Sequence, residues 1–205
     1  MLFSDTYRTV EGESRGLFKD RGSRFIAIAI PVTSQEEIKT RLADLRKEYH
    51  DARHHCFAWV LGPDRQSYRI NDDGEPSGTA GRPILGQINS KELTNILIVV
   101  IRYFGGTLLG VSGLINAYRS AAADAIANAT VVEKQLMEKW SITFPYTSMN
   151  DVMKVLRDEA CSQSDHSYSG IDVTVDIEFR SSRGDHVTGR LGKIPGLKMK
   201  WLSAV

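Results

Sequence analysis

Apolar and polar positions alternate along the chain in a way that predicts short strands in its first half. Three apolar, β-branched runs at 24–32, 54–61 and 95–104 are too short to cross a membrane and predict buried strands. The polar segment 66–71 follows the turn Gly62-Pro63-Asp64 and predicts one further strand. The run at 95–104 has the near-continuous apolarity of a central strand.

Helical spacing separates these strands. Ser34 and Glu37 form a capping box, after which apolar residues recur every three or four positions to Tyr49. Pro83 favours the first turn of a short helix over 83–88. An Ala-rich helix is predicted over 114–128, and its small residues would let it pack closely on the sheet: Ala117, Ala121, Ala122 and Ala125.

A polar, charged segment near Glu133 predicts a boundary between a domain at 1–133 and a second at 134–205. The second reads as a strand at 140–146, a helix opened by Ser148-x-x-Asp151, two strands, a short helix and an edge strand. In the alternating strand at 171–179 the predicted inward residues are Ile171, Val173, Val175, Ile177 and Phe179. The order βαββαβ is typical of a ferredoxin-like domain.

The composition is that of a soluble globular protein, with 205 residues, 41% apolar and 25% charged. Cys56 and Cys161 favour two reduced thiols over a disulfide. The start of the chain lacks the apolar region of a signal peptide, and the longest aliphatic run covers only residues 96–101. We therefore expect a cytoplasmic protein with no membrane partner.

Charge is balanced overall, at +1, so no global field attracts nucleic acid, and sequence-specific reading of DNA is not expected. Residues 180–205 depart from this balance, with six basic side chains against Asp185 alone, a local charge of +5. The nucleic-acid-binding candidates are therefore Arg180, Arg183, Arg190, Lys193, Lys198 and Lys200.

A glycine-rich loop, GGTLLGVSG at 105–113, joins the central strand to the Ala-rich helix. It nearly fits a nucleotide-binding P-loop, but Val111 stands where the phosphate-binding Lys belongs, so a nucleoside triphosphatase is disfavoured. Two interpretations stay open: a structural turn, or an anion site at the helix start. Candidate ligand residues are Arg82, Arg102, Gly105, Gly106, Gly110, Ser112 and Gly113.

An acidic loop, DDGEPSGTAGRP at 72–83, carries Asp72, Asp73 and Glu75. The residues suit a turn or cap, because Asp and Gly tolerate left-handed backbone, but they also suit an acidic site. Both alternatives stay open. Thr79 is the expected cap of the short helix.

Three histidines near Cys56 raise the question of zinc: His50, His54 and His55. They lack the spacing of a zinc site, and we expect instead that one His packs under the acidic loop. No catalytic triad or nucleophile elbow can be recognised. We therefore predict no metal, no cofactor and no catalytic residue.

Three segments together carry a resemblance: HHCFAWV at 54–60, NDDGEPSGTAGRPIL at 71–85 and VVIRYFGGTLLGVSGLINAY at 99–118. They are long and ungapped, and on them the chain resembles the bacterial, YigZ-type branch of the IMPACT family. The resemblance implies an α+β protein of two domains. The first would have the βαβ-type sandwich fold of elongation factor G domain IV, and the second the ferredoxin-like fold of that factor's domain V.

Eukaryotic members of this family regulate translation by competing for an activator of a stress kinase. The partner-binding domain that they use is not expected here. The resemblance thus implies a non-catalytic, RNA- or ribosome-associated protein with a role in translation, with a protein partner as a further possibility. The alternative is a small-molecule or phosphate-binding protein, or an enzyme, that uses the two glycine-rich loops.

We further expect the two loops to meet. Asp72, Asp73 and Glu75 would then pair with Arg82 and Arg102.

Overall fold

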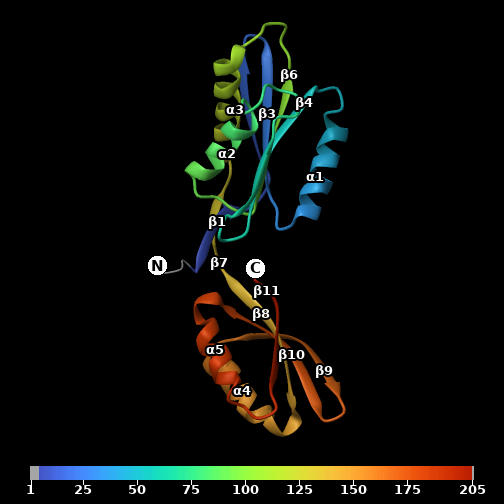
Figure 1. Ribbon diagram of the computed structural model, residues 1–205, viewed down its shortest axis with the longest axis vertical. Helices are drawn as coiled ribbons and strands as arrows, with labels where there is room; N and C mark the ends of the chain where they lie inside the picture. Colours follow the sequence, from blue (N-terminus) through green and yellow to red (C-terminus); the bar gives the residue numbers. More distant parts are fainter. Residues whose placement is uncertain (1–4, 205) are drawn as a thin grey trace. The chain divides into compact units, whose positions relative to one another are not determined.

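The computed structural model describes residues 5–204, which form two compact units (Figure 1). Residues 7–134 make the first unit, and residues 5–6 join 135–204 in the second. Strands β1 (Thr6–Val10) and β7 (Val131–Gln135) pair in a two-stranded sheet. No helix within 5–204 is long and apolar enough to span a bilayer. That the units are domains 1–133 and 134–205 stays a prediction.

The first unit is built on a five-stranded sheet in the order β2-β3-β6-β4-β5, with every neighbouring pair antiparallel. The predicted apolar strands are confirmed. The sequence analysis missed β2, whose seven residues alternate but include Gly16 and an exposed Leu17, and it missed β1 and β7 of the small sheet. The strands are β2 (Ser14–Asp20), β3 (Ser23–Pro31), β4 (His54–Leu61), β5 (Ser67–Asn71) and β6 (Ile96–Tyr103).

Helices cover both faces of this sheet (Figure 1): α1 (Gln35–Glu48) lies on one, and α2 (Gly81–Ser90) and α3 (Gly110–Ala127) lie on the other. The predicted cap of α1 is confirmed, because Ser34 Oγ accepts from the Glu37 N–H at 3.2 Å. α3 begins before the predicted Leu114. Leu109 and Leu114 are both buried in the core, so tertiary packing draws the glycine-containing segment into the first helical turn.

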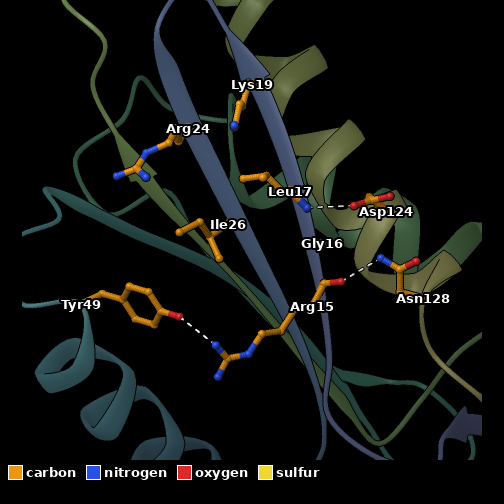
Figure 2. A pocket seen from close by; sticks show the side chains of 9 residues that line it. All are labelled: Arg15, Gly16, Leu17, Lys19, Arg24, Ile26, Tyr49, Asp124 and Asn128. Carbon is orange, nitrogen blue, oxygen red and sulfur yellow. Dashed lines mark hydrogen bonds between the residues drawn. The ribbon is translucent and has the colours of Figure 1, made fainter.

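The sheet edge at β2 is closed by α3 (Figure 2). The Leu17 N–H donates to Asp124 Oδ2 at 2.8 Å, and Asn128 Nδ2 donates to the Arg15 carbonyl at 2.9 Å. These side chains occupy backbone groups that would otherwise be free to pair with another strand. Gly16 lies between them, directly against the α3 backbone.

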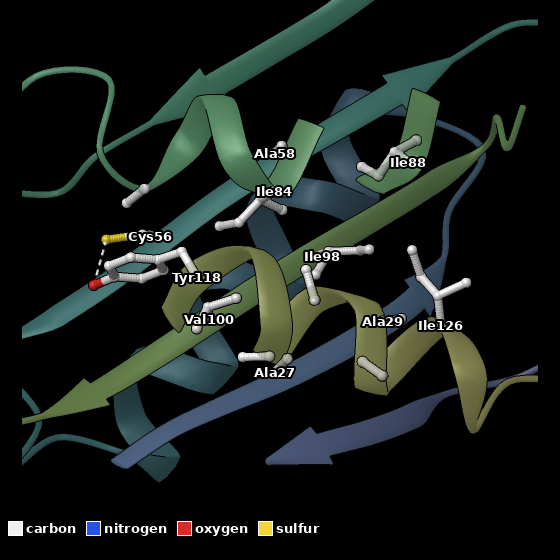
Figure 3. Close-up of a cluster of buried hydrophobic side chains, with 14 of the residues drawn as sticks. Ala27, Ala29, Cys56, Ala58, Ile84, Ile88, Ile98, Val100, Tyr118 and Ile126 are labelled. Carbon is white, nitrogen blue, oxygen red and sulfur yellow. Dashed lines mark hydrogen bonds between the residues drawn. The ribbon is translucent and has the colours of Figure 1, made fainter. Parts of the chain in front are cut away.

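The core between the sheet and the helices α2 and α3 contains many small residues (Figure 3). The predicted close packing of α3 is confirmed, since its four small residues are fully buried: Ala117, Ala121, Ala122 and Ala125. Ala27, Ala29 and Ala58 oppose them from the sheet. Short side chains on both surfaces bring the helix axis close to the strands, which the Gly16 contact requires.

The second unit has a four-stranded antiparallel sheet in the order β11-β8-β10-β9, with two helices on one face. Its element order, βαββαβ, is the predicted one. The elements are β8 (Met137–Pro145), a 3-10 turn (Tyr146–Ser148), α4 (Met149–Asp158), β9 (Ser162–Ser169), β10 (Asp172–Arg180), a 3-10 turn (Ser181–Arg183), α5 (Gly184–Leu191) and β11 (Lys198–Ala204).

Two local predictions for this unit are wrong. Ile171 is 78% exposed, because it lies in the turn before β10, whereas Val173 and the later inward residues are buried. Ser148 does occupy the position before α4, but its hydroxyl donates to the Pro195 carbonyl at 3.5 Å and does not cap the helix.

The contact between β2 and α3 gives a testable prediction. A Cβ at Gly16 would lie 2.3 Å from the Ala125 amide nitrogen, which is backbone and cannot rotate away, so Gly16→Ala should lower the free energy of unfolding by about 2–3 kcal/mol. Gly12→Ala is the matched control, since nothing lies within 4 Å of a Cβ there, and it should change stability by less than about 0.5 kcal/mol. Urea unfolding measures both. Equal stability of the two variants would contradict the packing described.

Candidate functional site at the acidic and glycine-rich loops

The Asp72 carboxylate sits inside the acidic loop and binds its backbone. Oδ2 accepts from the Gly78 N–H at 2.8 Å, and Oδ1 accepts from the Ala80 and Gly81 N–H groups at 3.0 and 2.8 Å. Burial opposes ionisation, but the three N–H donors outweigh it and the pKa of Asp72 is lowered. The carboxylate therefore fills the place at the start of α2 where an external anion would bind.

The expected cap by Thr79 is wrong. Its hydroxyl donates to the Pro76 carbonyl at 2.6 Å, and Ala80 takes the N-cap position with no side-chain bond. The loop closes tightly enough that Asp72, eight residues earlier, reaches the helix start first.

Asp73 ties the loop to α1 and β4. Its carboxylate accepts from Arg46 Nη2 at 2.8 Å and from the His55 N–H at 2.7 Å. Burial again opposes ionisation, and the bonds from Arg46 and His55 lower the pKa of Asp73 overall. His54 Nδ1 lies 2.8 Å from the Asp73 carbonyl, which confirms that a histidine packs against this loop. Asp73 and Gly74 have φ of 43° and 87°, the left-handed turn that the sequence suggested.

Glu75 joins the two loops through a buried ion pair. Its Oε1 accepts from Arg102 Nη1 at 2.6 Å and from the Tyr118 hydroxyl at 2.8 Å. The side chains of Glu75 and Arg102 are only 4% and 7% exposed. The Arg102 guanidinium also lies between the rings of Phe25 and Phe104, at 5.4 and 5.6 Å from their centroids.

The expected meeting of the loops is thus present at Glu75 and Arg102, but it does not include Arg82. Arg82 is exposed and makes no ion pair with any described residue. Its alkyl chain lies beside Gly78, and its charge acts on Asp72 only at longer range.

Tyr118 also connects the pair to Cys56 (Figure 3). Cys56 Sγ lies 3.0 Å from the Asp72 carbonyl oxygen and 3.3 Å from the Tyr118 hydroxyl, and its single S–H can donate to either. Burial raises the pKa of the thiol to about 12 and raises that of Tyr118 as well. A thiol with this pKa stays protonated near neutral pH and is a poor nucleophile. Nothing in the sequence pattern indicated Tyr118, because helical spacing alone marks it only as a core residue.

All three acids of the loop therefore have internal partners, which favours the turn-and-cap interpretation over an open acidic site. Across residues 5–204, no group of three His, Cys, Asp or Glu side chains is placed to hold a metal ion.

The glycine-rich loop divides into a packed part and an exposed part. A Cβ at Gly105 would lie 2.0 Å from the Gly22 carbonyl carbon, and its N–H donates to Ser23 Oγ at 3.1 Å. Gly106 and Gly110 have left-handed φ of 86° and 72° and open surroundings. The glycines thus supply close approach and turns.

Ser112 and Gly113 belong to the first turn of α3, whose start has no side-chain cap and no acidic residue. Arg102, which we expected to bind an anion at this loop, forms an ion pair with Glu75 instead. The exposed side chains that flank the start are apolar instead, with Leu108 81% and Val111 59% exposed.

In the second unit, two of the six basic candidates are neutralised. Arg183 Nη2 and Arg190 Nη1 each lie 2.6 Å from the Glu159 carboxylate, and Arg190 Nη2 lies 2.9 Å from Asp158. The Glu159 side chain is 3% exposed, and its pKa is lowered, mostly by the bond from Arg190. Counting charge over 180–205 missed these acids, because they lie at the end of α4, some twenty residues earlier in the sequence.

Four basic candidates stay exposed without an ion pair to any described residue: Arg180, Lys193, Lys198 and Lys200. Lys198 and Lys200 share one side of strand β11, opposite Thr143 and Ser141 of β8, and Trp201 follows them with 54% exposure. We call Lys198, Lys200 and Trp201 the β11 edge. An aromatic residue within a basic run was visible in the sequence and could have marked it.

Comparison with known proteins places this geometry in a family. The family model of the Impact N-terminal domain matches residues 21–126, a range that contains both loops and the Glu75–Arg102 pair. The chain belongs to the IMPACT family. The IMPACT family member YigZ of Escherichia coli is 38% identical over 136 residues, which cover 65% of this chain and 67% of YigZ.

Other similar proteins match different lengths of this chain. Protein IMPACT of Mus musculus is 35% identical over 96 residues, 44% of this chain and 30% of that protein. A crystal structure described as a hypothetical protein aligns over 97% of this chain and 98% of its own, with 28% identity and a TM-score of 0.74. The two-unit architecture is therefore shared with a solved structure, whereas the mouse protein shares a shorter region.

The buried ion pair gives a second prediction. Glu75→Ala leaves the Arg102 charge buried without its carboxylate, and Arg102→Ala does the reverse, so each should lower the free energy of unfolding by about 3–5 kcal/mol. The double variant should cost clearly less than the sum of the two, in a double-mutant cycle by denaturant unfolding. The same cycle on the more exposed pair Arg46 and Asp73, whose side chains are 48% and 21% exposed, should give a coupling below about 1 kcal/mol. Additive effects at Glu75 and Arg102 would refute a coupled pair.

Asp72 gives a third prediction, in pH. Its pKa is lowered in the folded protein, so its ionised form stabilises the fold above the unfolded value of about 3.9, and this contribution is lost as the pH falls through the folded value. Asp72→Asn should therefore cost about 1–2 kcal/mol at pH 7, and the difference from the unchanged protein should shrink below about pH 4.

Urea unfolding over a pH series measures this difference. Asp44→Asn, an exposed carboxylate on α1, serves as the control and should stay within about 0.5 kcal/mol of the unchanged protein. If Asp72→Asn lowers the free energy of unfolding by the same amount at every pH, the ionised carboxylate does not stabilise the fold through the N–H groups.

Proposed function

We propose that this protein is a non-catalytic, RNA- or ribosome-associated regulator of translation. Membership of the IMPACT family supports the role in translation, because the eukaryotic members that the sequence resembles regulate that process. The proposal includes the finer likeness of the two units to domains IV and V of elongation factor G, with the βαββαβ unit as a ferredoxin-like domain. Fold likeness alone does not establish function, so the surface must carry the argument.

The observation that carries the proposal is the β11 edge. Lys198 and Lys200 make no ion pair with any described residue, and they share one face of an edge strand. The exposed ring of Trp201 follows on the other face of the same strand, so the edge offers both kinds of group. Lysines bind phosphate oxygens without regard to sequence, and a tryptophan ring stacks on a base. The combination suits single-stranded or loop RNA.

The interior of the first unit supports a binding role over catalysis. The carboxylates, thiol and hydroxyl that the loops bring together, on Glu75, Asp72, Cys56 and Tyr118, bond to one another or to backbone. Because these groups are already bonded within the protein, they hold the two loops in a fixed shape that a partner can recognise.

Co-sedimentation with ribosomes over a salt series is the fourth prediction and tests the proposal. Binding should weaken steeply with salt, and Lys198→Ala with Lys200→Ala should weaken it at low salt and make the log–log salt slope shallower by about one to two. Trp201→Ala should weaken binding without changing that slope, because stacking releases no counterions.

Lys91→Ala with Lys154→Ala is the matched control, since it removes two exposed lysines elsewhere and should leave binding within about twofold. Circular dichroism confirms that each variant folds. Failure of the unchanged protein to sediment with ribosomes at low salt, or equal loss in the control, would overturn the proposal.

A further inference from the structure

A pocket of about 440 Å³ lies on the first unit, beside strands β2 and β3 (Figure 2). We call it the β2–β3 pocket. It runs round the β2 edge of the sheet, with Tyr49, just after α1, on one side and Asp124 and Asn128 from the end of α3 on the other. None of the residues singled out in the two loops lines it. A volume of this size suits a small molecule rather than a single ion.

The floor of the pocket is apolar and open. Leu17 and Ile26 are direct partners across β2 and β3, so their side chains lie next to each other on the same face. Leu17 is 48% exposed, although the edge strand that carries it is fixed to α3. Exposed Leu17 beside half-buried Ile26 on a rigid strand favours a ligand with a flat or apolar body.

Two cations stand together at one end. Lys19 and Arg24 are also direct partners across β2 and β3, and neither makes an ion pair with any described residue. Like charges directly opposite each other destabilise a strand pair, and an anion bound between them would relieve that repulsion. The Arg24 guanidinium lies over the ring of Tyr103, 4.9 Å from its centroid, which fixes its position.

The other end offers oriented polar groups. Arg15 Nη1 donates to the Tyr49 hydroxyl at 3.2 Å, and Nη2 lies 3.1 Å from Glu13 and 3.7 Å from Glu48. The charge of Arg15 is therefore balanced, unlike that of Lys19 and Arg24. Figure 2 shows Lys19 and Arg24 at one end, with Arg15 and Tyr49 at the other.

The carboxylates near the pocket have partners of their own. Asp124, which lines the pocket, accepts from the Leu17 N–H at 2.8 Å, and Asp51 accepts from the Tyr103 hydroxyl at 2.7 Å. Both donors are neutral, so Asp124 and Asp51 keep their charges, and the Asp51 charge acts on Arg24. Lys19 and Arg24 still make no ion pair with any described residue, and they lie one residue pair away from the apolar floor on the same face.

We propose that the β2–β3 pocket binds a nucleoside phosphate, with the phosphate between Lys19 and Arg24 and the base over Leu17 and Ile26. The nucleoside phosphate could come as a free nucleotide or as one unit of an RNA strand, and both present the same chemistry. The proposal goes beyond binding at the β11 edge, because the pocket belongs entirely to the first unit and needs no ribosome.

Calorimetric titration of the full chain with AMP, adenosine, inorganic phosphate, a hexa-adenylate RNA and an oligoglutamate peptide is the fifth prediction. AMP or the RNA should bind more tightly than adenosine or inorganic phosphate, because only they engage both the cations and the floor. Lys19→Ala with Arg24→Ala should weaken that binding about tenfold or more. Lys19→Arg should keep the affinity within about threefold, since it retains the charge.

Arg119→Ala with Lys91→Ala is the control, because it removes the same charge from exposed positions elsewhere on the first unit and should leave the affinity unchanged. Lys19→Ala alone keeps the test valid if loss of the Arg24–Tyr103 contact disturbs folding. Tight binding of AMP indicates a free nucleotide, and binding of the RNA alone indicates a strand. Each supports the pocket.

Several results overturn the proposal: no binding of AMP or RNA at millimolar concentration, equal binding of adenosine and AMP, equal binding of inorganic phosphate and AMP, or equal binding of the oligoglutamate peptide. Equal loss in the control variant also overturns it. Ribosome binding by the β11 edge can succeed or fail independently, since the two tests change residues in different units.

Discussion

The ion pair between Glu75 and Arg102 is the interaction on which the first unit depends. It is almost fully buried, and an isolated charge in that place would be strongly unfavourable. Because Arg102 lies near the end of the central strand β6 and Glu75 in the acidic loop, the pair fixes that loop over the end of the sheet. The hydroxyl of Tyr118, which lies on α3, donates to the same Glu75 carboxylate. One carboxylate therefore joins a loop, a strand and a helix.

Asp72 and Asp73 fix the rest of the acidic loop to its neighbours. Asp72 turns the loop into α2 by occupying its first N–H groups, and Asp73 ties the loop to β4 and to Arg46 of α1. The acidic loop is thereby a fixed connector between layers rather than an open ligand site. A surface held by such bonds can present neighbouring features, including the β2–β3 pocket, at low cost in conformational entropy.

The two units carry their exposed charge differently. In the second, Glu159 pairs with two arginines at 2.6 Å and offsets their charge, and the unpaired lysines of β11 share that strand with an exposed tryptophan. In the first, overall charge is balanced, yet Lys19 and Arg24 are left together on neighbouring strands. A local excess of positive charge, which the overall charge of +1 does not reveal, distinguishes both proposed binding surfaces.

The sequence by itself determined the layout of strands and helices, because burial forces a period of two or 3.6 on the side chains, and β3, β4, β6 and α1 carry that period clearly. It also favoured the left-handed turn at Asp73 and Gly74, because few residues tolerate that backbone, although it left an acidic site open as the alternative. Strand β2 escaped prediction because one of its inward positions is Gly16 and its outward Leu17 is exposed, so its apolar pattern is weak, and the role of Gly16 appears only when α3 packs on it.

Only the tertiary structure decided which charges meet. Three acids and two arginines allow many pairings, and the choice of Glu75 for Arg102, with Arg82 left in solvent, depends on the depth at which each backbone position lies. The same holds for Glu159 with Arg183 and Arg190, which are far apart in sequence. Pairing of charges is set by distance and burial, and sequence order encodes neither until the chain has folded.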